Sequence, residues 1–239
     1  MAIIQKLEIT HRKGDYLMIL EEPKIYVEEF DPIKIMKNIE KAMRTCYRSE
    51  GTITDDSYKR LLGMAITSGH ESVMEHEKIT VKLRCSVGTY KDLTRHRVGT
   101  AWSIESTRWC NYSKSKFDNQ LHFINPVYIK DKEQKEIWEE IMEDIEIAYM
   151  RGSKAGMFPD QLRTMLPHAT AADVTMTCNI REWRHILSLR TQKNVHPEIR
   201  QLLIPLLLKF QYTMPELFGD IQYDKEFPTE WYAEIDILE

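Results

Sequence analysis

The sequence predicts an α/β (α+β) fold: a single domain over residues 1–239, with a central, mostly antiparallel sheet flanked by helices. Three observations predict it, namely strand-like alternation, helical spacing of apolar residues, and an ordinary globular composition. Hydrophobic residues make up 42% and charged residues 29% of the chain, so a core can form without disulfides or a metal. No repeat, low-complexity tract or linker divides the sequence.

Segments enriched in Ile and Val are expected to form the strands: 3–10, 16–28, 79–87 and 170–178. A turn at Lys13-Gly14-Asp15 would join the first two. In the third, apolar side chains alternate with polar ones, as in a half-buried strand: Ile79, Val81, Leu83, Cys85 and Val87.

The remaining periodic segments are expected to be helices: 32–48, 54–69, 89–96 (a short helix or turn), 132–152, 159–165, 179–190 and 197–217. Asp31-Pro32 has the form of an N-cap followed by proline at the first helical position. The apolar face of the long acidic helix is expected to consist of Ile137, Trp138, Ile141, Ile145 and Ala148.

The charge balance and the cysteines exclude several classes of protein. The net charge is −4 and the pI is about 6.1, so non-specific nucleic-acid binding is not expected. No apolar window is long enough for a membrane span, and the N-terminus lacks the apolar core of a signal peptide. The cysteines are too widely spaced for a zinc site or a disulfide framework, so a reducing cytoplasm and no metal are predicted: Cys46, Cys85, Cys110 and Cys178.

A cluster of cationic residues is the clearest functional signal. Arg95-His96-Arg97 could converge on one anion, because guanidinium forks donate paired hydrogen bonds to phosphate, although alone it could be a solvated basic turn. Further along, Glu105-Ser106-Thr107-Arg108 adds hydroxyls and another cation. A strand between the two segments would carry Arg108 back past the first, which predicts a phosphate site.

These two segments resemble the signature of the flavin-dependent thymidylate synthases, which is Arg-His-Arg, seven residues, then Ser-x-Arg. Here the interval is eight residues, 98–105, one longer than in the family. Further matches extend the resemblance over roughly residues 40 to 202: Thr45-Cys46-Tyr47, Ser68 to His76 (against GHxSxxEH), Leu166-Pro167, Asn179 to His185 and Leu189 to Arg200.

The resemblance implies that the chain converts dUMP to dTMP. Methylenetetrahydrofolate would supply the carbon and NADPH the reducing equivalents, through FAD and without a cysteine nucleophile. The chain has no GxGxxG fingerprint, so FAD would be bound without a Rossmann fold. The family also implies a homotetramer with active sites shared between chains, acting on small molecules and on neither nucleic acid nor membranes.

The resemblance also implies the site residues. FAD would be held by His70, Ser72, Arg95, His96, Arg97, Ser188, Arg190 and Asn194. The nucleotide dUMP would be held by Asp92, Arg95, Glu105, Ser106, Thr107, Arg108 and Arg200. Arg200 is the expected catalytic residue, since a fixed guanidinium would stabilise the anion that develops on the uracil ring. Asp92 could equally be a surface acid of a helix, and Asp173 is given no role.

Two alternatives remain at this point. One is an enzyme with a cysteine nucleophile, for which Cys110 and Cys46 are the candidates, since the other two cysteines fall on apolar strand faces. The other is a non-enzymatic nucleotide- or RNA-binding module, in which aromatic rings and arginines would hold a single strand: Arg95, Arg97, Trp102, Arg108, Trp109 and Tyr112.

Overall fold

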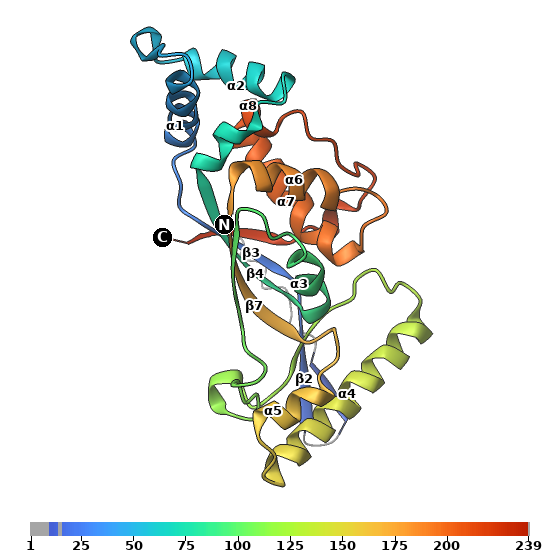
Figure 1. The fold of residues 1–239 in the computed structure, drawn as a ribbon. Coiled ribbons are helices and arrows are strands. Elements are labelled where there is room, and N and C mark those ends of the chain that lie inside the picture. Colours follow the sequence, from blue (N-terminus) through green and yellow to red (C-terminus); the bar gives the residue numbers. More distant parts are fainter. Residues whose placement is uncertain (1–9, 14–15, 239) are drawn as a thin grey trace, which may run out of the picture. The chain divides into compact units, whose positions relative to one another are not determined.

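The computed structural model describes residues 10–13 and 16–238, which fall into two compact units (Figure 1). Unit 1 comprises the chain up to Pro23, residues 84–92 and residues 104–174. Unit 2 comprises residues 24–83, 93–103 and 175 to the C-terminal end. The single domain over 1–239 stays a prediction. Most of the predicted strand 3–10 and the Gly14-Asp15 part of the predicted turn lie outside the described residues.

Unit 1 contains a three-stranded sheet in the order β1 (Thr10–Lys13), β2 (Tyr16–Glu21), β6 (His122–Ile124). β1 and β2 are antiparallel, whereas β2 and β6 are parallel. Helix α4 (Lys132–Lys154) packs on β2. The short helices of this unit are α5 (Pro159–Leu162), η3 (Ser115–Phe117) and η4 (Arg163–Met165), and most of α3 (Val87–Leu93) also belongs to it.

The buried face of α4 differs in part from the predicted one. Trp138 and Ile145 pack against the core as predicted, whereas Ile137 and Ile141 are each 52% exposed, and further core contacts come from Met142, Tyr149 and Met150. The same face buries Glu146, whose Oε1 accepts the Leu121 N–H at 3.3 Å, and burial raises its pKa to about 7. The spacing of apolar residues therefore predicted only part of this face, because the core also uses thioether side chains, a tyrosine and a buried acid.

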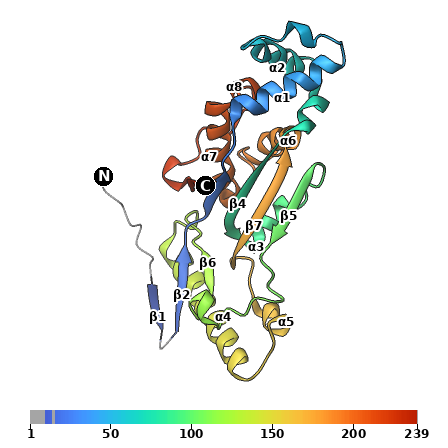
Figure 2. The ribbon, with the colours of Figure 1, turned by 90° about the vertical axis from the view of Figure 1, so that its left-hand side faces the viewer.

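The larger sheet has the order β5 (Thr100–Ile104), β7 (Ala171–Asn179), β4 (Lys78–Ser86), β3 (Lys24–Glu28), β8 (Glu234–Leu238). Figure 2 shows β4, β7 and β5 side by side. The Thr80 and Thr177 hydroxyls are 2.9 Å apart and the Ile180 N–H donates to Glu77 O, so β4 and β7 pair in opposite directions. β3 and β8 are parallel. The mixed fold of helices and sheets is confirmed.

The predicted strand 16–28 is divided into two strands. Glu22 and Pro23 separate β2 from β3, and the two belong to different sheets. Proline has no N–H to donate to a strand ladder, which explains the break at this position. By contrast, the predicted alternation in β4 is confirmed, with Ile79, Val81, Leu83 and Cys85 all buried.

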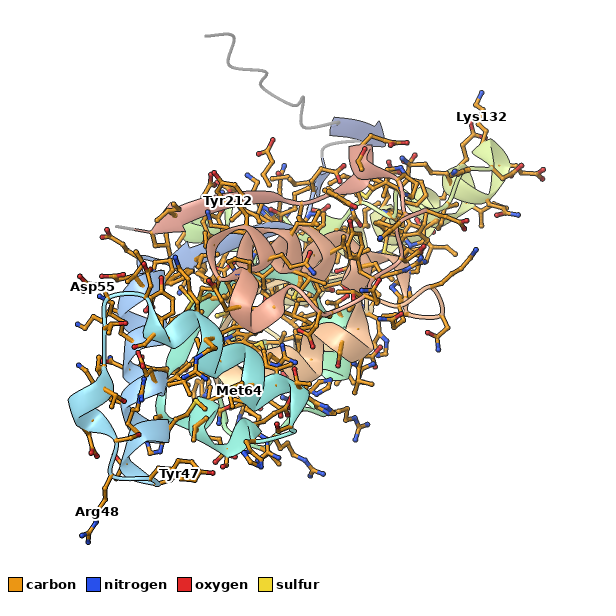
Figure 3. The ribbon with its side chains drawn as sticks, turned by 90° about the horizontal axis from the view of Figure 1, so that it is seen from above. Tyr47, Arg48, Asp55, Met64, Lys132 and Tyr212 are labelled. Atoms are coloured by element: carbon orange, nitrogen blue, oxygen red, sulfur yellow. The ribbon has the colours of Figure 1, made fainter. Side chains whose placement is uncertain are left out.

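Helices α1 (Pro32–Thr45), α2 (Ser57–Thr67) and α8 (Pro215–Phe218) belong to unit 2, with η1 (Glu50–Thr52), η2 (Glu71–His76) and η5 (Thr229–Trp231). The predicted cap is confirmed, because Asp31 Oδ1 accepts the Lys34 N–H at 3.0 Å. α1 ends at Thr45 instead of Arg48, which has a φ of 47° and therefore a left-handed backbone. Tyr47 and Arg48 project away from the ribbon in Figure 3.

Helices α6 (Ile180–Arg190) and α7 (Pro197–Thr213) pack against each other in unit 2. Their aromatic core includes Trp183, whose ring meets that of Phe210 edge-on with centroids 5.8 Å apart. The same ring of Phe210 contacts Phe218. In the part of the chain that the structure describes, no helix is long and apolar enough to cross a membrane.

Candidate functional site

The Arg95-His96-Arg97 segment lies in a turn between α3 and β5. Arg95 and Arg97 are exposed, whereas His96 is buried with 7% of its surface accessible. Among the described residues, neither of the two arginines has an ion-pair partner. The segment therefore directs two available cations outward and its imidazole inward.

The imidazole of His96 connects this turn to α6. Its Nε2 accepts a hydrogen bond from Arg190 Nε at 3.0 Å, and its Nδ1 lies 3.3 Å from Glu182 Oε1. Burial and the neighbouring Arg190 lower the pKa of His96 to about 4, so the ring is neutral at physiological pH. With Nε2 as acceptor, the ring proton is on Nδ1 and faces Glu182. Two segments expected to bind FAD are thus in direct contact.

Gly99 allows the chain to leave this turn close to the start of α6. It has a φ of +66°, and its carbonyl accepts the Asn179 N–H at 3.0 Å. A Cβ at Gly99 would overlap the side-chain amide of Asn179 at Nδ2. Asn179 is not free to yield, because its Oδ1 caps α6 by accepting the Glu182 N–H at 2.8 Å.

Replacing Gly99 by alanine is expected to lower the free energy of unfolding by about 1–3 kcal/mol, through left-handed strain and loss of the cap. The matched control is Gly63→Ala on α2, where an added Cβ meets nothing within 4 Å. That change is expected to stabilise the chain by up to about 1 kcal/mol. Urea unfolding measures the free energy of unfolding of both variants, and equal values for the two would contradict the expectation.

Glu182 and His185 are site residues that were not predicted from the sequence. One ligand atom from each of these two and from His96 lies within 4.8 Å of the others, a spacing that a metal ion could use. The rings of His96 and His185 also meet edge-on, with centroids 5.7 Å apart. The sequence feature that could have indicated Glu182 and His185 is the segment Asn179 to His185, which resembles the family and contains both residues.

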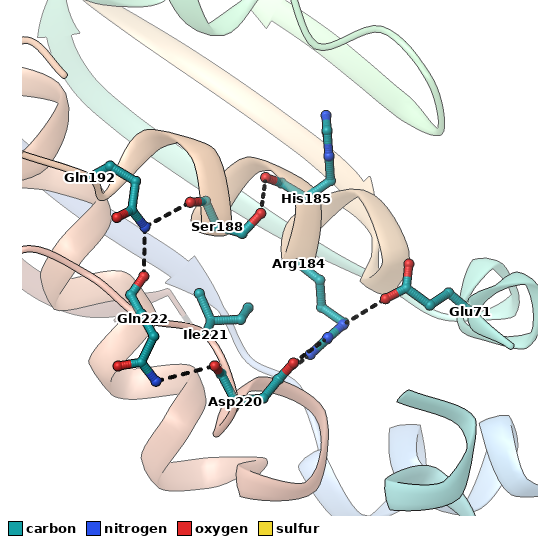
Figure 4. Close-up of a pocket in the computed structure, with 8 residues that line it drawn as sticks. All are labelled: Glu71, Arg184, His185, Ser188, Gln192, Asp220, Ile221 and Gln222. Atoms are coloured by element: carbon teal, nitrogen blue, oxygen red, sulfur yellow. Dashed lines mark hydrogen bonds and ion pairs between the residues drawn. The ribbon is translucent and has the colours of Figure 1, made fainter. Parts of the chain in front are cut away.

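A polar pocket of about 380 Å³ lies along one face of α6 (Figure 4). α6 and the turn after it supply Arg184, His185, Ser188 and Gln192, and the facing walls are Glu71 and residues 220–222. Of the predicted FAD residues, Ser188 lines this pocket. His70 and Ser72 flank Glu71 in the sequence and are exposed.

The guanidinium of Arg200 is held on α7. Nη1 donates to Asp224 Oδ2 at 2.6 Å, and Cζ lies 4.6 Å from the centroid of the Phe227 ring. The pair is largely enclosed, since the side chains of Arg200 and Asp224 are 13% and 6% exposed. Asn194, in the connection between α6 and α7, is exposed.

Unit 1 carries the predicted phosphate segment. Ser106 O accepts the N–H groups of Trp109 at 3.0 Å and Cys110 at 2.9 Å, which closes a tight turn. Within the described residues, the backbone N–H groups of Thr107 and Arg108 have no acceptor. Arg108 is exposed and its Cζ lies 5.2 Å from the centroid of the Trp109 ring. The turn therefore offers N–H groups, hydroxyls and a guanidinium to an anion.

Glu105, also predicted to contact dUMP, is engaged within the protein. Its carboxylate accepts from Tyr112 Oη at 2.8 Å, from the Asp173 N–H at 3.2 Å and from Arg84 Nη1 at 3.4 Å. Arg84 also pairs with Asp173 at 3.3 Å and with Glu21 at 2.6 Å. The carboxylate thus anchors the start of the turn. Asp92, on α3, is exposed.

None of the four cysteines, all within the described residues, forms a disulfide, and Cys85 and Cys178 are buried as predicted. Burial and the neighbouring Glu105 raise the pKa of the Cys110 thiol, and the opposing effects of Lys116 and of the Ser106 backbone are smaller. A raised pKa disfavours the thiolate, which is the nucleophilic form of cysteine. The environment of Cys110 therefore does not favour nucleophilic catalysis.

Comparison with curated proteins gives one consistent description. The flavin-dependent thymidylate synthase of Pyrococcus abyssi is 29% identical over 157 residues, which span 65% of this chain and 63% of that enzyme. The matched segment thus covers less than two thirds of this relative. The Corynebacterium glutamicum flavin-dependent thymidylate synthase is 26% identical over 208 residues, covering 78% and 79% of the two chains.

Two solved structures share the fold. Helicobacter pylori thymidylate synthase X, crystallised with FAD and dUMP, has a TM-score of 0.67 at 18% identity, over 83% of this chain and 98% of that one. The UMP/dUMP methylase PolB of Streptomyces cacaoi has a TM-score of 0.69 at 21% identity, over 84% and 95%. The family model described as thymidylate synthase complementing protein matches residues 33–216, and the chain belongs to that family.

Proposed function

We propose that this protein is a flavin-dependent thymidylate synthase that converts dUMP to dTMP, with methylenetetrahydrofolate as carbon donor and NADPH as reductant. The observation that carries the proposal is the 3.0 Å hydrogen bond from Arg190 to His96. It joins two segments 94 residues apart, both expected to bind FAD. The proposal includes a homotetramer with shared sites and a cytoplasmic location.

The exposed residues of unit 2 fit an FAD molecule. Arg95 and Arg97 have no ion-pair partner among the described residues and suit the pyrophosphate. His70, Ser72, Ser188 and Asn194 provide polar side chains at accessible or pocket-lining positions. His96 holds Arg190 by accepting from its Nε. When bound, FAD supplies the redox chemistry, and the protein supplies binding and orientation.

The nucleotide would be bound through its phosphate by the turn at Ser106-Thr107-Arg108, with Asp92 and Arg95 as further proposed contacts. Arg200 would donate hydrogen bonds to the uracil ring and stabilise the negative charge that develops there. A guanidinium has several N–H donors, Asp224 accepts from Nη1 alone, and Nε is buried, so the donors that remain for a substrate are those of the two terminal nitrogens. Glu105 would act by fixing the turn as well as by lying beside the nucleotide.

The first test is the visible absorption spectrum of the purified protein, before and after NADPH is added without oxygen. Oxidised-flavin bands that bleach with NADPH, followed by dTMP formation from dUMP, support the proposal. A colourless protein that also takes up no added FAD would overturn it. UMP is assayed beside dUMP, because the Streptomyces cacaoi neighbour is described as a UMP/dUMP methylase.

Replacing Cys110 by alanine is expected to leave dTMP synthesis measurable, because burial disfavours its thiolate. Steady-state turnover with dUMP measures this, with flavin content and thermal unfolding checked in parallel. The conserved-size control Cys110→Ser separates loss of packing from loss of the thiol. Abolished turnover in a folded, flavin-loaded variant would support the cysteine mechanism instead.

The RNA-binding alternative is not favoured. Of its proposed aromatic residues, Tyr112 is 4% exposed and donates its hydroxyl to Glu105. Trp102 is half-buried and its Nε1 donates to His96 O at 3.2 Å. Only Trp109 offers a largely exposed ring among these three described residues. Stacking of a single strand needs accessible rings, so these side chains have structural uses instead.

A further inference from the structure

The segment from residue 220 to 227 lies beyond the region matched by the family model, and it is bonded to the connection between α6 and α7. The Asp224 N–H donates to Thr191 O at 2.9 Å, and Gln192 Nε2 donates to Gln222 O at 2.7 Å. This connection begins directly after Arg190 and contains Asn194. The segment therefore bonds to the connection that runs from one of the proposed FAD contacts, Arg190, through another, Asn194, to the start of α7.

The same segment determines where the Arg200 guanidinium lies. Asp224 Oδ2 accepts from Arg200 Nη1 at 2.6 Å, and Oδ1 accepts the Glu226 N–H at 3.2 Å. The carboxylate is thus fixed on both oxygens, and its backbone is fixed through Thr191. Phe227 lies against the guanidinium, with 4.6 Å between Cζ and the ring centroid, and restricts its tilt.

We propose that Asp224 is the positioning residue for the catalytic Arg200, holding the guanidinium in the orientation in which its remaining N–H groups meet the uracil ring. This inference rests on the proposed thymidylate synthase function. A long arginine side chain has many rotamers, and catalysis by charge stabilisation requires donors that are already in place. Asp224 and Phe227, which lie outside the residues matched by the family model, restrict the Arg200 guanidinium to one orientation.

The test compares variants of the full-length, flavin-loaded protein. Asp224→Asn keeps the size of the side chain and one acceptor but removes the charge that fixes Arg200. We expect kcat for dTMP formation to fall about 10- to 100-fold, the scale on which small misplacements of reacting groups act. Flavin content and the rate of flavin reduction by NADPH in the absence of dUMP are expected to match the parent.

The matched control is Glu226→Gln, two residues away. Glu226 is an exposed acid that pairs with exposed Lys193, so the substitution removes the same charge from the same segment without touching Arg200. Its kcat is expected to equal that of the parent. A loss of kcat as large as that in Asp224→Asn would mean that the segment acts through its charge or its stability, and would overturn the inference.

A double-mutant cycle gives a readout that a structural role would not produce. If Asp224 acts only through Arg200, then Asp224→Asn in an Arg200→Ala background is expected to cause little further loss of kcat. If the double variant lost kcat by the product of the two single-variant factors, the inference would be overturned. A kcat equal to that of the parent in Asp224→Asn alone would also overturn it. A parent protein that takes up FAD but makes no product from dUMP would instead overturn the proposed function, and this inference with it.

Discussion

Replacing Arg200 by alanine is expected to lower kcat for dTMP formation by about 10²- to 10³-fold, the range for removal of a donor that stabilises developing charge. Flavin content is expected to fall much less, because the proposed FAD contacts lie on other elements, at residues such as His70, Arg95 and Arg190. Turnover with saturating dUMP, together with flavin absorbance per chain, measures the two effects separately.

The Arg200 substitution requires a check on folding. It leaves the Asp224 carboxylate, only 6% exposed, without its cation, and an unpaired buried charge destabilises a protein. Thermal unfolding is therefore measured, and Arg200→Lys keeps the charge while removing the fork. Arg181→Ala on α6 is the matched control, since Arg181 is half-exposed and pairs with Glu75. Equal, complete loss of turnover and flavin would show that Arg200 is structural.

The fold was predictable where one-dimensional patterns determine burial. Strand β4 follows its alternation, and α1 begins at the predicted Asp31 cap. The sequence could not show that Pro23 separates strands of two different sheets, because strand pairing is a long-range property. The buried face of α4 was predicted only in part for a related reason: Glu146 is buried there with a bond to Leu121, which no hydrophobic pattern indicates.

The site was predictable only as far as the signature motifs extend. They indicated His96 and Arg190 separately, and the structure brings these two into contact. They did not indicate that His96 would be buried and neutral, because its pKa depends on Arg190 and on burial in the folded chain. Asp224 had no sequence signal, since an aspartate 24 residues from Arg200 becomes its partner only through tertiary packing.

Replacing Arg108 by alanine is expected to weaken dUMP binding by about 1–3 kcal/mol, the scale of a hydrogen bond to a charged group. This corresponds to a rise in Kd of about 5- to 150-fold. The reason is geometric: Arg108 is an exposed guanidinium on a turn in which the backbone N–H groups of Thr107 and Arg108 have no acceptor among the described residues. Titration calorimetry of the flavin-loaded protein with dUMP measures the change.

If Arg108 binds the phosphate of dUMP, its replacement is expected to affect only ligands that carry a phosphate. Deoxyuridine lacks the phosphate, so its weaker binding is expected to be the same in the parent and in Arg108→Ala. Lys116→Ala is the matched control, because it removes another exposed cation of unit 1, one that lies over the Phe117 ring. It is expected to leave the Kd of dUMP unchanged. If Arg108→Ala weakened deoxyuridine and dUMP equally, Arg108 would contact the nucleoside or support the fold, and the turn at Ser106 would lose its role as the phosphate site.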